Sequence, residues 1–183
     1  MRYAEPGGCG VAGGRVTSDG MTDIIIRGAT ATDWPGVWDL FRHVSAAGDV
    51  FAYDEHTPED VARKLWFDPP AVCFVAELDG RLAGTYFLRP NQPGRGNHVA
   101  NGGYMVADEF RGRGVASMMC AHSIETARTL GFAAMQFNFV VSTNTAAVRT
   151  WEKHGFAVAG RLPKAFRHAT QGFVDVFVMF REV

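Results

Sequence analysis

A glycine-rich turn lies in the stretch Val106-Ala107-Asp108-Glu109-Phe110-Arg111-Gly112-Arg113-Gly114-Val115-Ala116, between an apolar segment and a helical pattern. Gly112 and Gly114 allow unusual backbone angles and a close approach of another molecule to the main chain. The first amides of the following helix lack partners inside it, and the aligned peptide dipoles place about half a positive charge at that end. Arg111 and Arg113 add two full charges. The stretch therefore predicts an anion site, with a diphosphate held mainly by backbone donors.

Two other interpretations of this turn compete with a phosphate site. A plain connection also explains a Gly-rich turn before a helix, and Arg-Gly repeats occur in disordered RNA-binding tails. The tail interpretation fails because the stretch occurs once and is flanked by apolar periodic segments. The G-x-x-x-x-G-K-[ST] pattern is missing, and Ser117 stands where the third glycine of G-x-G-x-x-G belongs. The residues alone leave a phosphate site and a structural turn open.

The motif Arg111-x-x-Gly114-x-Ala116 after a predicted strand resembles the acetyl-coenzyme A pyrophosphate loop, R/Q-x-x-G-x-G/A, of the GCN5-related N-acetyltransferase (GNAT) superfamily. The stretch 144–156 resembles the superfamily's N-x-x-A-x-x-x-Y-E-K-x-G-F helix, with Trp151 in place of tyrosine. These motifs together are far more specific than either alone, and the similarity in element order covers residues 23–183. Shorter stretches at 136–138, 160–163 and 173–175 resemble a branch of small-molecule acetyltransferases that includes the fungal azetidine-2-carboxylate enzymes.

The composition is that of one soluble globular domain. The chain has 183 residues, of which 47% are hydrophobic and 20% charged, and its formal net charge is -1. A chain of this length buries about two thirds of its unfolded surface without metal or disulfide support. Nucleic-acid binders usually carry a basic excess, and a membrane span needs roughly 20 apolar residues in a row. We therefore expect neither a nucleic-acid nor a membrane partner, and leave a homodimer open.

The cysteines indicate a cytoplasmic protein. Cys9, Cys73 and Cys120 are far apart and lack C-x-x-C spacing, so neither a disulfide framework nor a metal site is predicted. Cys73 and Cys120 lie in apolar patterns typical of packing residues. Residues 1–22 are Gly-rich and lack the apolar core of a secretion signal, so we expect a flexible leader before a single domain at 23–183.

Hydrophobic periodicity and turn residues predict the element order β-α-α-β-β-β-α-β-α-β-β. Asp79-Gly80 is the strongest hairpin signal. We expect strands at 24–26, 71–78, 81–88, 98–106, 133–141, 156–160 and 172–180, and helices at 34–47, 58–67, 115–130 and 144–154. The resemblance implies an α+β, three-layer GNAT fold, with a mixed central sheet of about seven strands and helices on both faces. It also implies a splay between strands 4 and 5, where a pantetheine arm serves as a surrogate strand.

The resemblance implies a set of cofactor-binding residues. It assigns the Val106 amide to the oxyanion of the reacting thioester, the amides of Arg111, Arg113, Gly114 and Ala116 to the pyrophosphate, and the Asn144 side chain to the cofactor arm. From its position alone Asn144 is also a helix N-cap, and the two roles are compatible. The complete predicted set for acetyl-coenzyme A is Val106, Arg111, Gly112, Arg113, Gly114, Val115, Ala116, Asn144, Ala147 and Trp151.

The proton-transfer groups are not evident from the sequence. Many relatives carry tyrosine at the position of Trp151, whose indole N–H donates a hydrogen bond but releases no proton at accessible pH. Solvent protonation of the thiolate, another acid, or an inactive chain all remain open, and we favour solvent. Asp175 lies among apolar residues, where desolvation would raise its pKa, so it is the first candidate base. The alternatives are a structural carboxylate at 175, a base at His98, His168 or Glu55, and a water relay.

The acceptor pocket is expected between the first two helices, from 49 to 56, together with the 162–171 loop. Its predicted substrate contacts are Tyr53, Asn101, Tyr104, Asn138 and His168. Lys164, Arg167 and His168 would suit a carboxylate-bearing amine. The leading hypothesis is therefore acetylation of the amine of a small molecule, an amino acid or an analogue. The alternatives are acetylation of a protein N-terminus or lysine, and a non-catalytic acyl-coenzyme A sensor.

Overall fold

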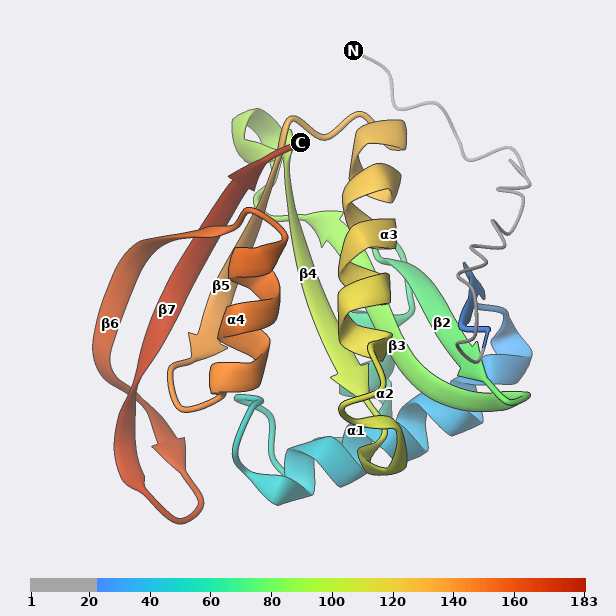
Figure 1. Ribbon diagram of the computed structural model, residues 1–183, viewed down its shortest axis with the longest axis horizontal. Helices are drawn as coiled ribbons and strands as arrows, with labels where there is room; N and C mark the ends of the chain where they lie inside the picture. The colour runs from blue at the N-terminus through green and yellow to red at the C-terminus, as the bar shows by residue number, and fades with distance from the viewer. Residues whose placement is uncertain (1–22) are drawn as a thin grey trace.

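A single mixed sheet organises the molecule (Figure 1). The computed structural model describes residues 23–183, and the predicted leader at 1–22 lies outside the described residues. Seven strands follow the spatial order β1-β2-β3-β4-β5-β7-β6, and only β4 and β5 are parallel. The strands are β1 (Ile25–Gly28), β2 (Val72–Leu78), β3 (Arg81–Pro90), β4 (Val99–Val106), β5 (Ala134–Val141), β6 (Ala157–His168) and β7 (Gly172–Glu182). The predicted fold class and element order are confirmed.

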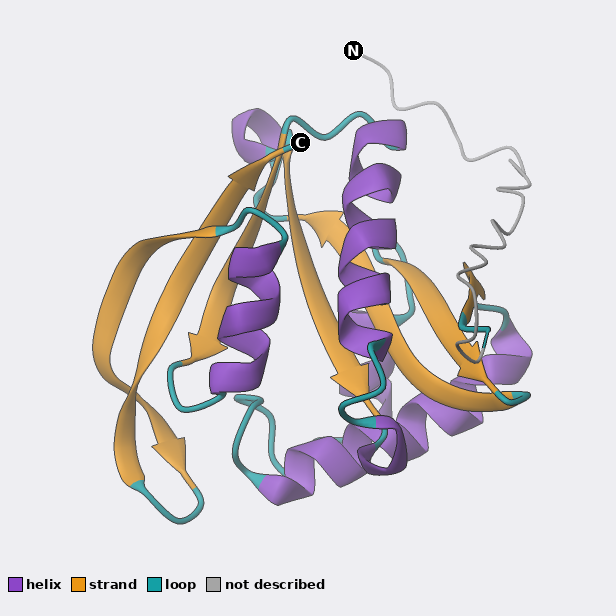
Figure 2. Cartoon of the chain, viewed as in Figure 1, coloured by secondary structure: helices purple, strands orange, loops and turns teal. Residues whose placement is uncertain are grey.

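Helices cover both faces of this sheet (Figure 2). They are α1 (Trp34–Ala47), α2 (Glu59–Trp66), α3 (Val115–Thr129) and α4 (Thr145–Lys153), with short 3-10 turns η1 (Ala31–Asp33), η2 (Gly94–Gly96) and η3 (Asp108–Phe110). On what we call the α1/α2 face, Trp66 packs against Phe87. On the opposite α3/α4 face, Met119 and Trp151 share a core with Tyr86. The sheet therefore separates two distinct surfaces.

Local sequence explains where several elements begin and end. Asp33 accepts hydrogen bonds from the Thr30 amide at 2.7 Å and from both terminal nitrogens of Arg27 at 2.8 Å, which secures the chain before α1. Gly48, with φ 62°, ends α1 in the left-handed conformation. Asp79 and Gly80 have φ of 54° and 71°, as a two-residue hairpin turn with type I′ geometry requires.

The β6 strand is much longer than predicted. It was expected at 156–160 but spans Ala157–His168, and it pairs with β7 along its length through two register shifts. Pro163 cannot donate to a ladder, so its position normally argues against a strand. The shift between Leu162 and Phe166 forms a bulge that accommodates Pro163 and Lys164, whose φ is 54°. Much of the predicted 162–171 loop is therefore part of a β-hairpin.

Candidate active site

The pairing of β4 with β5 stops partway along the strands. Their partners are Val99 with Ala134, Ala100 with Met135 and Asn101 with Gln136. Figure 1 shows the two strands starting side by side and then diverging, with α3 and α4 in front of them. We call the unpaired stretch beyond Asn101 and Gln136 the strand gap. The predicted splay between strands 4 and 5 is confirmed.

The Val106 amide faces the strand gap. The Ala107 amide donates to the Ala83 carbonyl at 3.0 Å, and the Asn91 amide donates to the Val99 carbonyl at 2.8 Å. Hydrogen-bonded residues alternate along an antiparallel ladder, so odd-numbered residues of β4 direct their backbone groups toward β3. Even-numbered residues, Val106 among them, direct theirs toward β5. Because pairing with β5 has ended by then, this amide has no strand partner among the described residues.

The glycine-rich turn carries a row of unpaired amides. Gly112 and Gly114 have φ of 75° and 84°, and Gly114 is the N-cap of α3. The first helical hydrogen bond runs from Met118 to the Gly114 carbonyl at 3.0 Å. Within the described chain, five amides in this region have no hydrogen-bond partner, at residues 112, 114, 115, 116 and 117. Residues 111–114 are exposed, so the glycine amides of the turn are accessible to an anion.

The two arginines of the turn are engaged with their neighbours. The amides of Arg111 and Arg113, predicted to bind pyrophosphate, donate to the carbonyls of Asp108 at 3.1 Å and Phe110 at 3.3 Å. The Arg111 guanidinium pairs with Asp108 at 2.8 Å, and that of Arg113 pairs with Asp79 at 3.3 Å. In this structure the donors available to an anion are therefore the neighbouring glycine and helix amides.

The start of α4 lies after the diverging end of β5. Asn144 is the N-cap, and its Oδ1 accepts a hydrogen bond from the Ala147 amide at 3.2 Å. The capping role is confirmed, and it engages the amide of Ala147. The Asn144 side-chain Nδ2 has no partner among residues 23–183, so it remains free to donate to a ligand.

Trp151 is a core residue of the α3/α4 face. It is 6% exposed, and its ring centroid lies 4.7 Å from that of Tyr104 and 5.1 Å from that of Phe137. The Tyr104 hydroxyl lies 2.7 Å from the Ser123 hydroxyl on α3, and burial raises its pKa well above the ordinary 10.0. Tyr104 was predicted to contact the acceptor beside Asn101. The structure corrects this placement, because the period of two along a strand puts residues 104 and 101 on opposite faces.

Amide side chains gather on the α1/α2 face beside the strand gap. A Cβ at Gly103 would meet Phe87 and Trp66, so residues 103 and 101 face this side. Gln136 Nε2 donates to Asn138 Oδ1 at 2.8 Å, and Asn138 Nδ2 donates to Asn91 Oδ1 at 2.7 Å. We call Asn91, Asn101, Gln136 and Asn138 the amide group. The structure thus brings the predicted contacts Asn101 and Asn138 onto one face.

A further polar side chain on this side, Arg89, was missed by the sequence analysis. Arg89 pairs across β3 and β4 with Asn101, and alternation puts it on the same face as Phe87. The ring of Tyr53, a predicted contact, packs against that of Phe41 with the centroids 5.6 Å apart. The positive charge of Arg89 acts to lower the pKa of Tyr53, against the larger effect of burial. The position of Arg89 two residues after an inward-facing aromatic was the signal that could have identified it.

Asp49 begins the segment that the sequence predicts to line the acceptor pocket. Its Oδ1 is buried without a hydrogen-bond partner in the described part of the chain. The preceding Gly48 carbonyl accepts a hydrogen bond from the Ala169 amide at 2.9 Å. The loop after α1 therefore touches the tip of the β6–β7 hairpin, and a buried acceptor lies beside that contact.

Asp175 stabilises the β6 bulge. Its Oδ1 accepts from the Lys164 amide at 2.8 Å and its Oδ2 from Arg161 Nε at 2.6 Å. These contacts lower the pKa of Asp175 below the ordinary 3.8, so the expected increase is wrong. The bulge leaves a backbone donor that a carboxylate can satisfy, and this geometry matches the structural alternative. His168 lies in the same hairpin, where its Nδ1 accepts from the Thr170 amide at 3.1 Å.

The other candidate bases lie at the edges of the site. His98 is exposed just before β4, with its Nδ1 3.1 Å from the Arg95 carbonyl. At about 3.3 Å per strand residue, it lies roughly 26 Å from Val106. Glu55 is exposed in the loop between α1 and α2, 3.6 Å from His56. The position of His98 therefore places no base beside the Val106 amide.

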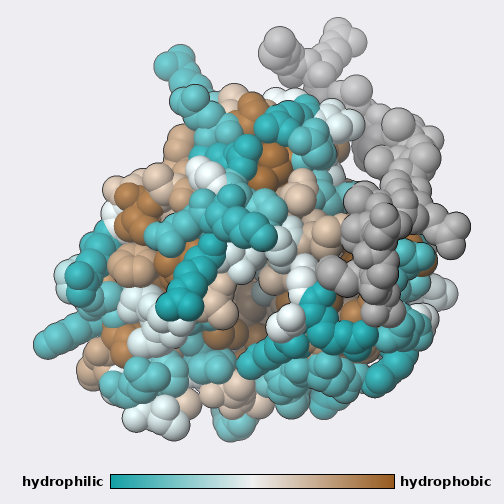
Figure 3. Space-filling model, in the orientation of Figure 1, coloured by the Kyte–Doolittle hydropathy of each residue, from teal (hydrophilic) through white to brown (hydrophobic). Residues whose placement is uncertain are grey.

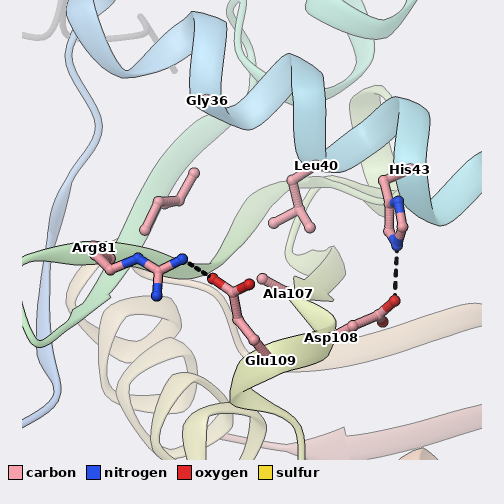
Figure 4. Close-up of a pocket in the computed structure, with 8 residues that line it drawn as sticks. Gly36, Leu40, His43, Arg81, Ala107, Asp108 and Glu109 are labelled. Atoms are coloured by element: carbon pink, nitrogen blue, oxygen red, sulfur yellow. Dashed lines mark hydrogen bonds and ion pairs between the residues drawn. The ribbon is translucent and has the colours of Figure 1, made fainter.

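A cavity of about 450 Å³ lies at the end of β4, on the side of α1. In Figure 4, His43 points toward Asp108 and Arg81 toward Glu109, so two polar contacts cross between the walls. The lining residues come from α1, β3 and the turn after β4, with none from β5. This cavity therefore lies on the β3 side of β4, away from the strand gap.

The surface of the α3/α4 face is hollowed near its centre, between the two helices, with pale and brown atoms in the hollow (Figure 3).

None of the helices in residues 23–183 combines the length and the apolar character of a membrane span. These residues also bring no group of three or more His, Cys, Asp or Glu side chains together in the manner of metal ligands.

Comparison with known proteins identifies the family. The profile of the Acetyltransferase (GNAT) family matches residues 36–156. A solved structure of a GCN5-related N-acetyltransferase from Kribbella flavida is 42% identical, with a TM-score of 0.83 over 87% of this chain and 98% of that one.

Two curated proteins are also similar. The N-acetyltransferase aca1 of Schizosaccharomyces pombe is 34% identical over 107 residues, which are 57% of this chain and 51% of that protein. This chain therefore spans about half the length of aca1. The L-amino acid N-acetyltransferase AaaT of Escherichia coli is 28% identical over 88% of this chain and 99% of its own. The family profile, the fold and the strand gap agree, and the chain belongs to the acetyltransferase (GNAT) family.

Proposed function

We propose that this protein transfers the acetyl group of acetyl-coenzyme A to the amine of a small molecule, an amino acid or an analogue, by direct attack in a ternary complex. One observation carries the proposal: the sheet loses its pairing after Asn101 and Gln136, between a face with a turn of unpaired amides and a face with the amide group. A donor from one side and an acceptor from the other can then meet. The amino-acid acceptor is supported by the similarity to AaaT.

The residues of the α3/α4 face fit the donor. Acetyl-coenzyme A supplies a thioester, an extended arm with two amides, and a diphosphate. The five unpaired amides at 112 and 114–117 match the diphosphate, because charge-assisted bonds to backbone N–H groups need no side-chain cation. Asn144 Nδ2 is free to bond the arm, since its Oδ1 alone serves the cap. The arm would follow the strand gap, where β4 presents unpaired backbone groups.

Attack by the amine forms the new C–N bond and breaks the C–S bond of the thioester. Negative charge develops on the carbonyl oxygen during attack, and the Val106 amide that faces the strand gap would donate to it. A fixed backbone donor of this kind is worth about 3 to 4 kcal/mol in the transition state. Holding the amine and the thioester together in the reactive geometry can lower the activation barrier by roughly 7 to 11 kcal/mol more.

Proton transfer relies on solvent in this proposal. Trp151 releases no proton, and the Tyr104 hydroxyl is bonded to Ser123 with a raised pKa. A thiolate whose thiol has a pKa of about 8.5 is a good leaving group and can take its proton from water. Because Asp175 is held in the hairpin, we assign removal of the amine proton to water as well.

A thiol-release assay across a panel of amines tests the proposal. The panel contains free amino acids, their carboxamides, simple amines and short peptides, and calorimetry measures acetyl-coenzyme A binding in parallel. We expect binding, together with turnover of small amines. Binding without turnover would favour a sensor, and turnover confined to peptides would favour a protein-modifying enzyme. No heat with acetyl-coenzyme A would overturn the proposal.

A further inference from the structure

Arg89 is unusual among the arginines of this protein. Four arginines in the described chain are partly buried, at positions 27, 63, 89 and 181. Arg27 and Arg63 pair with carboxylates, and Arg181 donates to the carbonyl oxygens of Glu182 and His154. Arg89 has no ion pair and no hydrogen bond to any residue in 23–183. Its guanidinium is therefore available to a ligand that carries a carboxylate.

The position of Arg89 puts this charge at the end of the strand gap where β4 and β5 are still paired, opposite Asn101 and five residues along β4 from Val106. Arg89 is the cross-strand partner of Asn101, and Asn101 pairs with Gln136 at the last point before β4 and β5 separate. Adjacent strands are about 4.8 Å apart, so the base of the Arg89 side chain lies one strand from the edge of the strand gap. A carboxylate bound there would leave an amine on the neighbouring carbon close to the gap.

The groups around Arg89 favour an anion. The amide group supplies neutral donors and acceptors, and the bonds from Gln136 to Asn138 and from Asn138 to Asn91 fix its orientation. Burial raises the pKa of the Tyr53 phenol above the ordinary 10.0, and the charge of Arg89 opposes this increase, which places the two groups near each other. A planar guanidinium matches a carboxylate through paired N–H bonds.

We propose that Arg89 binds the carboxylate of the acceptor, which makes amino acids and close analogues the substrates of this enzyme. The proposal deepens the proposed function and rests on it. It replaces the predicted carboxylate contacts of the 162–171 segment, whose Lys164 belongs to the β6 bulge and whose Arg167 stacks on the exposed Phe173 ring at 5.6 Å.

The test compares Arg89→Gln with wild type on the best free amino acid of the panel and on its carboxamide. We expect wild type to prefer the free acid. The substitution should lower kcat/KM for the acid by about 10- to 150-fold, the range for a hydrogen bond to a charged group. The value for the carboxamide should change little. The ratio of kcat/KM for the acid to kcat/KM for the carboxamide is taken for each protein, and the two ratios are compared. The difference in amine reactivity between the substrates then cancels.

Two further variants control this comparison. Arg42→Gln removes a positive charge from the exposed surface of α1, where the side chain is 56% exposed, and should preserve the preference for the acid. Arg89→Lys keeps the charge but lacks the planar guanidinium. Its preference for the acid should lie between those of wild type and Arg89→Gln. Thermal melting and acetyl-coenzyme A binding show whether each variant is folded.

The outcomes separate the two proposals. If wild type acetylates amines without preferring acids, or if Arg89→Gln lowers the rates for acid and carboxamide equally, the role of Arg89 is overturned and the proposed function stands. If wild type acetylates no amine at all, the proposed function fails and this inference fails with it.

Discussion

The glycine turn offers a matched pair of substitutions at the two ends of α3. Gly114, at the N-terminus, has φ 84°, and Gly131, just after the C-terminus, has φ 81°. A Cβ added at either position meets nothing within 4 Å, so alanine causes no clash at either end. Both substitutions therefore introduce the same left-handed strain and differ only in what lies nearby. Gly114 is among the unpaired amides, and Gly131 is one helix length away.

The expected magnitudes follow from these angles. A non-glycine residue in the left-handed region costs about 1 to 2 kcal/mol, and the smaller entropy of alanine in the unfolded chain offsets about 0.4 to 1 of that. Each variant should lose about 1 kcal/mol of unfolding free energy, or roughly 2 to 4 °C in Tm. Relief of the strain at Gly114 would turn one or two amides away from the anion. At about 1.5 to 3 kcal/mol per charge-assisted bond, the Kd for acetyl-coenzyme A should rise at least tenfold.

Calorimetric titration of both variants with acetyl-coenzyme A measures this difference. Gly131→Ala should bind as wild type does while showing the same decrease in Tm, which separates loss of binding from loss of stability. Coenzyme A without the acetyl group should give the same pattern, because the diphosphate is common to both. Equal Kd values for the two variants would refute backbone recognition of the diphosphate at this turn.

Three other substitutions or reactions test separate parts of the structure. Val106→Pro removes the amide that faces the strand gap. We expect kcat to fall about 100- to 1000-fold, with a nearly unchanged Kd for acetyl-coenzyme A. An unaltered kcat would exclude the Val106 amide as the oxyanion donor. Asp33→Asn should lower the unfolding free energy by about 1 to 2 kcal/mol near neutral pH. Arg27 lowers the pKa of Asp33 below its ordinary 3.8. The stabilisation by ionised Asp33 is therefore present above pH 3.8 and is lost as the pH falls further. Urea unfolding of wild type and variant at about pH 7 and about pH 2.5 would detect this change. Burial raises the pKa of Cys73 to about 11 and of Cys120 to about 12, so a short alkylation pulse should label neither thiol until the protein unfolds, as mass spectrometry can show.

The donor side could be predicted from the sequence because its groups are contiguous. A glycine turn before a helix fixes the positions of its own amides, whatever packs around it. Gly112 and Gly114 adopt the positive φ that the prediction requires, and the strands on either side separate as expected. The amides of Arg111 and Arg113 were expected to bind the pyrophosphate, but they donate to carbonyl groups of the turn. This could not be predicted, because it depends on hydrogen bonds within the turn itself.

The hairpin at the C-terminus shows a different limit. A short strand was expected at 156–160 with a loop at 162–171, and an acid among apolar residues at 175 indicated a raised pKa. Both inferences fail for one reason: a bulge absorbs Pro163, and Asp175 on the partner strand accepts the bulge's free amide. The bulge depends on the register of β6 against β7, which no local pattern reveals.

The acceptor side depends entirely on register. Tyr53, Arg89, Asn101 and Asn138 come from a loop and three strands, and a shift of one residue in any strand would move its side chain to the other face. Tyr104 illustrates this, since it follows Asn101 by three residues and lies on the α3/α4 face. Because donor recognition uses backbone groups and acceptor recognition uses side chains, a substitution at position 89 can change the acceptor without disturbing the donor. A shift from acids to neutral amines in Arg89→Gln, with acetyl-coenzyme A binding intact, is the result that this separation requires.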